Sequence, residues 1–131
     1  MRLLLRVIKA LWLLPVAIPI WVLYLWPAHA LGLLRRDPDW SGVAVFEVVP
    51  GRSRIWDHLW RPWAGHGLPG AMVLYPCSGG WAFWHEQRHV MQWEALGILF
   101  PVVYVLFLAR FGYEDSPLEE DARACADRVV P

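Results

Sequence analysis

The longest apolar stretch of the chain lies near its amino terminus. From Ala10 to Leu34 there are 25 consecutive residues without Asp, Glu, Lys or Arg. A helix needs about 20 apolar residues to cross the hydrocarbon core of a bilayer, so the stretch predicts a transmembrane helix within an amino-terminal anchor, residues 1–34. Pro15, Pro19 and Pro27 each remove a backbone hydrogen bond, so we expect local kinks.

A cleaved signal peptide is the alternative interpretation of the same stretch. Arg2, Arg6 and Lys9 form a basic start, and Ala28-His29-Ala30 fits the A-x-A outline of a cleavage site. The apolar run is longer than the usual signal-peptide core of about 7 to 15 residues, which favours the anchor. Both interpretations direct the chain to a membrane.

Short apolar runs interrupted by Pro, Gly, Asp and Arg occupy residues 35–80. Ser41–Val49 is rich in valine and ends in a Pro-Gly turn signal, so it predicts a strand, and Gly70–Tyr75, bounded by prolines, predicts another. Between them, Arg52–Gly67 places three tryptophans among arginines and histidines. That composition is typical of a loop or short helix on a membrane surface.

The spacing of large side chains becomes helical after residue 80. Trp81 to Leu96 contains neither Pro nor Gly and predicts a helix. Ala95 to Ala109 then gives 15 uncharged residues between Glu94 and Arg110. This run is short for a full span, so it predicts either a second membrane crossing or a re-entrant or protein-buried helix.

The composition of the 131-residue chain supports a membrane protein of a single domain. Apolar residues make up 57% of it, charged residues 18%, and ten tryptophans suit the boundary between headgroups and hydrocarbon. Net charge is zero and no basic run could follow a phosphate backbone, so we expect a lipid bilayer and no nucleic acid as partner. Cys77 and Cys125 allow at most one bridge and leave the compartment undecided.

One pentapeptide in the predicted helix carries chemistry, namely His85-Glu86-Gln87-Arg88-His89. Side chains four residues apart on a helix project about 40 degrees from one another, so both histidines can bind one Zn²⁺ ion. Glu86 is then the predicted catalytic base, which accepts a proton from a zinc-activated water as that water attacks a peptide carbonyl. The alternative is an exposed helix whose histidines face water.

A catalytic zinc ion needs a third protein ligand from elsewhere in the chain. The segment from Tyr113 to Ala126 contains Ser116-Pro117, which predicts a helix cap and first position, followed by Glu119, Glu120 and Asp121. Acidic residues at a helix amino terminus are also favoured by the helix dipole alone. From the pattern itself, a ligand and plain capping both remain open.

The sequence from His85 to Phe100 reads H-E-x-x-H-V-x-Q-x-E-x-x-G-x-L-F, and it is followed by Tyr104 and by Y-x-D-x-P-x-E-x-x-A from Tyr113 to Ala122. These motifs resemble a family of small bacterial membrane proteins with a minimal gluzincin-like metallopeptidase core. The resemblance covers residues 70–126. It implies that Glu119 is the third zinc ligand and that the protein is a peptidase of the bacterial inner membrane.

The same resemblance implies a substrate site on the edge strand of a cleft, where a peptide would add as a further strand. Its residues would be Gly70, Ala71, Met72, Val73, Leu74 and Tyr75. The chain departs from the family pattern at Trp93, Ser116 and Asp121, and Arg123 stands where larger gluzincins often place an aspartate. Asp127 is the candidate to replace that aspartate beside the metal ligands.

Other polar residues are weaker candidates. His58, His66, Tyr113 and Arg88 could donate to an oxyanion, although histidines beside tryptophans also suit a membrane interface. Gln92 and Glu94 are predicted to position the helix, and Tyr104 to pack against it.

The predicted fold is an α+β membrane protein with an amino-terminal transmembrane helix, short antiparallel strands, a zincin-like HExxH helix, an apolar helix and a carboxy-terminal glutamate helix. The domain that follows the anchor would span residues 35–131. The leading functional hypothesis is a zinc metallopeptidase acting on peptides or proteins. The alternatives are a non-catalytic protein with a structural zinc site, closed by a fourth ligand such as His58 or His66, and a small membrane subunit without metal.

Overall fold

The computed structural model describes residues 2–38, 43–76 and 78–130, with the backbone alone for residues 2–7, 9 and 10. It confirms the predicted mixture of helices and a sheet. In chain order the elements are α1 (Arg2–Ile20), the π-helical η1 (Trp21–Leu25), α2 (Trp26–Ala30), β1 (Leu34–Asp37), β2 (Ala44–Val48), α3 (Arg54–Trp60), β3 (Gly65–Leu68), β4 (Ala71–Leu74), α4 (Gly79–Leu96), the 3-10 turn η2 (Gly97–Leu99), α5 (Phe100–Phe111) and α6 (Pro117–Val129).

The four strands form one mixed sheet in the order β1-β2-β4-β3. β1 with β2 and β3 with β4 are antiparallel pairs, whereas β2 and β4 run parallel. The prediction of antiparallel strands is therefore wrong for the central pair. Parallel neighbours need a crossover connection, and α3 with β3 supplies it between β2 and β4.

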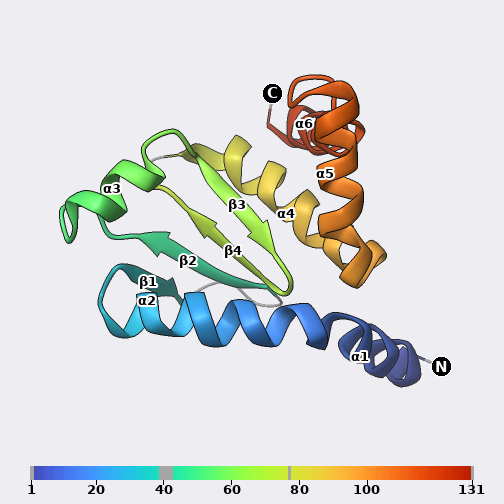
Figure 1. Ribbon diagram of the computed structural model, residues 1–131, viewed down its shortest axis with the longest axis horizontal. Coiled ribbons are helices and arrows are strands. Elements are labelled where there is room, and N and C mark those ends of the chain that lie inside the picture. The colour runs from blue at the N-terminus through green and yellow to red at the C-terminus, as the bar shows by residue number, and fades with distance from the viewer. Residues whose placement is uncertain (1, 39–42, 77, 131) are drawn as a thin grey trace.

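Alternating side chains make this sheet the middle layer of the molecule (Figure 1). On one face, Phe46 and Val73 pack with Leu25 of η1 in a buried cluster. On the other face, Met72 packs with Val90 of α4. Successive strand residues point to opposite faces, so the amino-terminal helices cover one side of the sheet and α4 covers the other.

The amino-terminal apolar run forms a nearly continuous helix that bends part-way along α1 (Figure 1). Pro15 and Pro19, where we expected kinks, lie inside α1. The π-helical η1 follows α1 directly. Leu25 and Ala28 are buried against the sheet, whereas Ile18, Leu23 and other apolar side chains of the opposite side are exposed. The second half of the predicted anchor therefore also packs as a layer of the domain.

Within the described residues, two helical stretches are long and apolar enough, by length and composition, to cross a membrane: Leu11–Ala30 and Gly79–Phe111. The second joins α4, η2 and α5, and its outer side exposes Val102, Val105 and Leu106. Gly97, at φ +55°, ends α4, and a Cβ added there would overlap the indole of Trp12. The glycine thus lets α1 approach the junction of α4 and α5 closely.

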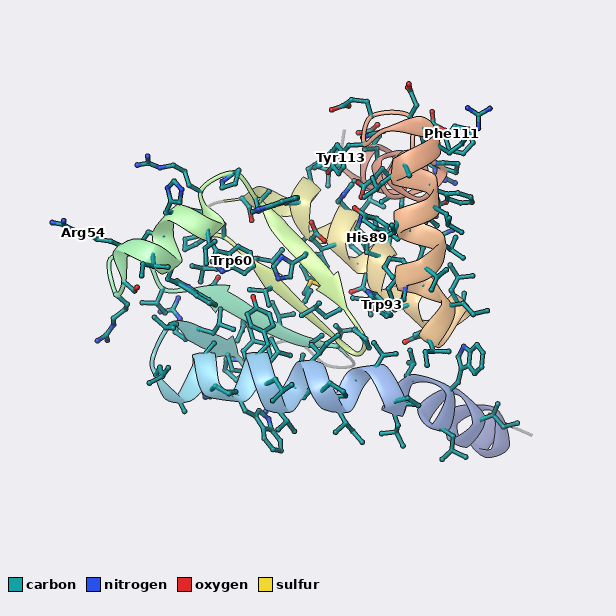
Figure 2. All side chains as sticks on the ribbon, viewed as in Figure 1. Arg54, Trp60, His89, Trp93, Phe111 and Tyr113 are labelled. Carbon is teal, nitrogen blue, oxygen red and sulfur yellow. The ribbon has the colours of Figure 1, made fainter. Side chains whose placement is uncertain are left out.

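The strand predictions match the structure at their centres and miss two strands. β2 lies inside the predicted Ser41–Val49, whose first two residues fall outside the described part of the chain. β1 and β3 were not predicted at all. Residues 52–67 contain α3, which fits the expectation of a short helix, and Figure 2 shows Arg54 at its outer end pointing away from the molecule.

The position of β4 corrects the predicted substrate site. β4 lies inside the predicted Gly70–Tyr75 strand, but it pairs with β2 on one side and with β3 on the other. Its backbone groups are therefore used within the sheet, and a peptide cannot add to it. The strand at this edge of the sheet, beside α4, is β3.

The helix that carries the pentapeptide and the helix that carries Glu119 both form where predicted. α4 begins two residues before Trp81 and ends at Leu96. α6 begins at Pro117 with Ser116 as its cap residue, although the buried Ser116 hydroxyl makes no capping hydrogen bond. Cys125 of α6 is a free thiol, and Cys77 lies outside the described residues.

Replacing Gly67 of β3 by alanine should destabilise the fold strongly. A Cβ at this position would lie 2.5 Å from the backbone oxygen of Glu86 and 2.7 Å from the Cβ of His89, and the backbone cannot move aside cheaply. Overpacking of this kind costs about 1–3 kcal/mol, so the melting temperature in detergent should fall by about 5 °C or more. Gly80→Ala is the control, because its Cβ would meet only Val130 at 3.8 Å. Equal melting temperatures for the two variants would contradict the packing described.

Candidate metal centre

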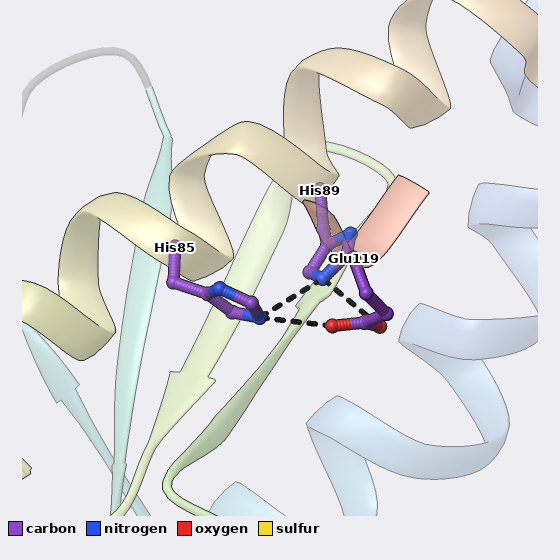
Figure 3. Close-up of side chains that lie close together, drawn as sticks. All are labelled: His85, His89 and Glu119. Carbon is purple, nitrogen blue, oxygen red and sulfur yellow. Dashed lines mark hydrogen bonds and ion pairs between the residues drawn. The ribbon is translucent and has the colours of Figure 1, made fainter. Parts of the chain in front are cut away.

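Three buried side chains converge where α4 meets α6. His85 and His89 lie one turn apart on α4, and Glu119 comes from the first turn of α6. The two Nε2 atoms are 3.2 Å apart, and the carboxylate oxygens of Glu119 lie 3.3 Å from His85 Nε2 and 3.4 Å from His89 Nε2. Figure 3 shows the donor atoms of all three pointing at one another.

The spacing and chemistry of these donors fit a metal ion. Two ligands of a tetrahedral zinc ion, each about 2.0–2.1 Å from the metal, are about 3.4 Å apart. Two imidazoles and a carboxylate form the ligand set of catalytic zinc sites that keep a fourth position open. Among the described residues, no other His, Cys, Asp or Glu joins the group. The structure thus confirms that these three residues come together in a group that could hold a metal ion.

An unsatisfied carboxylate oxygen strengthens this fit. Glu119 is 1% exposed, and its Oε2 makes no hydrogen bond although His85 Nε2 is 3.3 Å away. Burying a charged oxygen without a partner is costly, whereas a cation between the three donors would satisfy it.

A hydrogen-bond network fixes the ring of His89 in an orientation that would suit a metal ligand. The Gln92 amide nitrogen donates to Leu118 O at 2.9 Å and to Asp121 Oδ2 at 2.8 Å, so its Oε1 faces the ring. That oxygen accepts from His89 Nδ1 at 2.8 Å. Because the proton then sits on Nδ1, the lone pair of Nε2 points toward Glu119, as a metal ligand requires. The predicted positioning role of Gln92 is consistent with these contacts.

A second set of contacts locks α6 onto α4. Arg88 donates from Nε and Nη2 to the two Asp121 oxygens at 2.7 and 3.0 Å, and these hydrogen bonds hold the pKa of that carboxyl below its usual range. Ala122 and Ala126 are fully buried and let the helices approach closely. Arg88 is therefore occupied in positioning Glu119 and does not lie free as the oxyanion donor considered from sequence.

Aromatic residues hold the ring of His85. The Trp81 indole stacks on it with ring centres 5.0 Å apart, and Trp81 Nε1 donates to Asp127 Oδ1 at 2.7 Å. Asp127 thus acts on the tryptophan beside the metal-binding group and does not hydrogen-bond His85 or His89. His85 Nδ1 has no hydrogen-bond partner in the described structure.

Tyr104 is a contact of the site that the sequence interpretation did not assign. Its hydroxyl donates to Glu119 Oε1 at 2.6 Å, from α5. Burial alone would raise the pKa of Glu119, but the two imidazoles beside it and the Tyr104 hydroxyl outweigh burial and hold that pKa well below the usual range. Glu119 is therefore an anion at neutral pH.

Glu86 lies in the same cavity as the metal-binding group. The cavity has a volume of ≈ 360 Å³ and includes His85, Glu86, His89 and Glu119 in its lining. Glu86 is 6% exposed, and the Gly67 backbone N–H hydrogen-bonds its carboxylate. Figure 2 shows His89 and Trp93 on the side of α4 that faces α5. The remaining walls come from α4, from β3 and the residues just before it, from α5 and from the Tyr113 loop: Trp63, Gly65, His66, Gly67, Trp93, Phe100, Pro101, Tyr104, Val105 and Tyr113.

The other candidate residues from the sequence differ in whether they line the cavity. Tyr113 lines the cavity, and burial raises its pKa to about 12, so its hydroxyl keeps its proton. His66 also lines the cavity, but its Nε2 is hydrogen-bonded to Tyr24 Oη at 3.1 Å, and burial lowers its pKa to about 4. His58 is exposed on α3 and does not line the cavity. None of the predicted substrate-strand residues 70–75 lines it either.

Comparison of the chain with protein-family models, curated proteins and solved structures found no match. We therefore infer a function from the residues of this chain.

Replacing Gln92 by leucine should weaken metal binding without removing any ligand. The substitution keeps the size of the side chain but removes the acceptor that orients His89. Losing such an outer contact typically costs a factor of about 10 to 100 in metal affinity. Competitive titration of purified protein against a zinc-binding dye measures this, with Met91→Leu, at a half-exposed neighbouring position, as the control. Unchanged affinity in Gln92→Leu would contradict the assigned role.

Proposed function

We propose that the protein is a membrane-bound zinc metallopeptidase in which His85, His89 and Glu119 hold the metal and Glu86 is the general base. One observation carries this proposal. The three converging donors and the Glu86 carboxylate line a single cavity, so a metal ion, a base and space for a substrate coincide.

The residues of the chain account for the steps of peptide hydrolysis. Zinc bound at the three donors would supply an activated water and polarise the peptide carbonyl. Glu86, buried beside His85, takes the proton of the attacking water and passes it to the leaving amine. Tyr113 keeps its proton at neutral pH and donates to the oxygen that develops negative charge.

The open side of the metal-binding group favours catalysis over a structural role. A structural zinc site usually has all four positions filled by protein. The fourth ligands considered from sequence are not available, because His66 is hydrogen-bonded to Tyr24 and His58 is exposed away from the cavity.

The edge strand β3 is the element best suited to hold a peptide. Tyr75 N donates to Ala64 O at 2.8 Å, so by the alternation of an antiparallel pair the backbone groups of Gly65 and Gly67 point away from β4. Trp93 Nε1 already donates to Gly67 O at 3.0 Å, whereas Gly65 borders the cavity. An extended peptide can pair with Gly65 through its backbone alone, which suits substrates of varied sequence.

The apolar outer side of α5 supports a site close to a membrane boundary. α5 forms one wall of the cavity, and Val105 is both a lining residue and 61% exposed. With the two stretches that are able to span a membrane, this supports a peptidase working at a bilayer surface. The resemblance of the motifs to those of small bacterial membrane proteins implies that this bilayer is the bacterial inner membrane.

Metal analysis combined with a peptide-cleavage assay tests the proposal. Protein purified in non-ionic detergent should contain about one zinc ion per chain, judged against iron, manganese, cobalt and nickel by mass spectrometry. It should cleave members of a peptide library, lose this activity with a chelator and regain it with zinc. Wild-type protein without stoichiometric metal would overturn the peptidase and the structural-zinc hypotheses together. Protein that contains stoichiometric zinc but cleaves no peptide would refute the peptidase and favour the structural zinc site.

A further inference from the structure

A second cavity adjoins the first at the metal-binding group. It has a volume of ≈ 480 Å³ and is lined by the start of α4, by residues 62–65, by Tyr113 and by Arg123 of α6. The two cavities share the residues Trp63, Gly65, His85, Glu86 and Tyr113. They therefore form one groove with His85 and Glu86 at its middle, and a substrate could occupy both sides of the bond that is cut.

The two ends of this groove differ in charge. The end along α5 is walled by Phe100, Pro101 and Val105, which are apolar. The other end contains Arg123, and among the side chains that the structure describes no other Lys or Arg lines either cavity. Arg123 lies four residues after Glu119, so both side chains project from the same face of α6.

Arg123 has donors to spare for a ligand. It donates to the backbone oxygen of Glu114, and its Nη1 lies 3.7 Å from the Glu114 carboxylate. That carboxylate is 85% exposed, so the ion pair is largely solvated and contributes little. The guanidinium carries five N–H donors in a planar fork that matches a carboxylate. The Arg123 side chain is only 26% exposed, so a carboxylate that enters the groove meets it with reduced competition from water.

We propose that Arg123 forms a carboxylate-binding subsite on one side of the metal-binding group, which selects substrates with an acidic side chain or a free terminal carboxylate there. This inference rests on the proposed function and specifies its substrate class. A charge-assisted hydrogen bond typically contributes a factor of about 10 to 100 in affinity, so the selection should be easy to measure.

Peptide binding to the zinc-loaded Glu86→Gln protein tests the subsite without turnover. The probes are dye-labelled hexapeptides built on alanine, with amidated ends and a single Glu, Gln or Lys moved from position to position. A further set carries a free terminal carboxylate and no acidic side chain. At one position, or at the free terminus, the carboxylate should bind at least about tenfold more tightly than its neutral counterpart. Which set shows the gain identifies the source of the carboxylate.

Variants of the same protein separate the proposed role from a structural one. In the Glu86→Gln background, Arg123→Gln should remove the carboxylate preference and Arg123→Lys should keep part of it. Glu114→Gln, which removes the ion-pair partner but leaves the arginine, should retain or increase it. Arg128→Gln is the control on α6, because Arg128 is exposed and its Nε donates to Ala124 O. Zinc content of every variant shows whether the metal-binding group is intact.

The outcomes separate the subsite from the peptidase. Equal binding of Glu and Gln peptides, or a preference that survives Arg123→Gln, overturns the subsite. Should Arg123→Gln fail to fold, an Arg123→Lys protein with an undiminished preference for Glu over Gln peptides would overturn it instead. Wild-type protein that cleaves Glu and Gln peptides equally well refutes the subsite but keeps the peptidase. A carboxylate preference that depends on Arg123, in a wild-type protein that cleaves no peptide, keeps the subsite and refutes the peptidase.

Discussion

Replacing Glu86 by glutamine should abolish peptide hydrolysis while the metal stays bound. Glutamine has nearly the same shape and can still accept from the Gly67 N–H, so the cavity should persist. It cannot take a proton, and removing a general base typically costs a factor of about 10² to 10⁴ in rate. Because Glu86 is not one of the three converging donors, zinc content measured by mass spectrometry should remain near one per chain.

The matching substitution Glu86→Asp separates chemistry from packing. Aspartate keeps the carboxylate but shortens its reach, so it should retain a measurable fraction of the rate that glutamine loses. Cleavage of the best library peptide, followed as kcat/KM and kcat separately, provides the measurement. Full activity in Glu86→Gln would contradict the general base, and loss of zinc in the same variant would show that Glu86 is a ligand.

The parts of the site that the sequence predicted correctly depend on local geometry. The spacing of His85 and His89 fixes their relation once residues 81–96 are helical, because four residues make about one turn. Pro117 similarly fixes the start of α6 and places Glu119 in its first turn. What the pattern alone could not decide was whether α6 packs against α4 at all.

That packing depends on contacts between residues far apart in sequence. Asp121 joins Arg88 and Gln92 across the two helices, and Ala122 and Ala126 make the close approach possible. From sequence, an acidic residue in the first turns of a helix is explained equally well by the helix dipole. The hydrogen bonds between Arg88 and Asp121 distinguish packing against α4 from stabilisation by the helix dipole, and only the structure shows them.

The missed edge strand has a physical reason as well. Gly65-His66-Gly67 shows no alternation of apolar and polar side chains, and glycine is unfavourable in strands, so no pattern indicates β3. In the structure these glycines are required, because a Cβ at Gly65 would lie 2.7 Å from Val73 O. A glycine inside a strand often marks a close approach of backbones, and a Cβ at Gly67 would lie 2.5 Å from Glu86 O, so this glycine lets the edge strand approach α4.

A chain of 131 residues has little material with which to wall a cleft. Two elements resolve this difficulty. β3 lies over α4 at the positions of Glu86 and His89, and α5 brings Tyr104 to Glu119 and Phe100 into stacking contact with Trp93. The apolar run 95–109 thus serves the cavity as well as any membrane contact.

Replacing Glu119 by glutamine should remove the metal, which is the largest effect we expect from any single substitution at the site. A zinc site with four protein ligands binds with about 10–16 kcal/mol, so one ligand contributes on the order of 3 kcal/mol, or about a hundredfold in affinity. An amide oxygen is a far weaker zinc ligand than a carboxylate. Glutamine can still accept from the Tyr104 hydroxyl, so the fold should survive while zinc content falls to a small fraction of one per chain and hydrolysis falls with it.

Glu120→Gln is the matched control, because it makes the same chemical change one residue along α6 on an exposed side chain. It should leave zinc content and cleavage unchanged. If wild type and Glu120→Gln bind zinc and Glu119→Gln binds it equally well, the third ligand is a different group and the convergence of Glu119 on His85 and His89 is only a buried ion pair. That ion pair would need a proton on an imidazole, whereas a metal ion needs neutral rings.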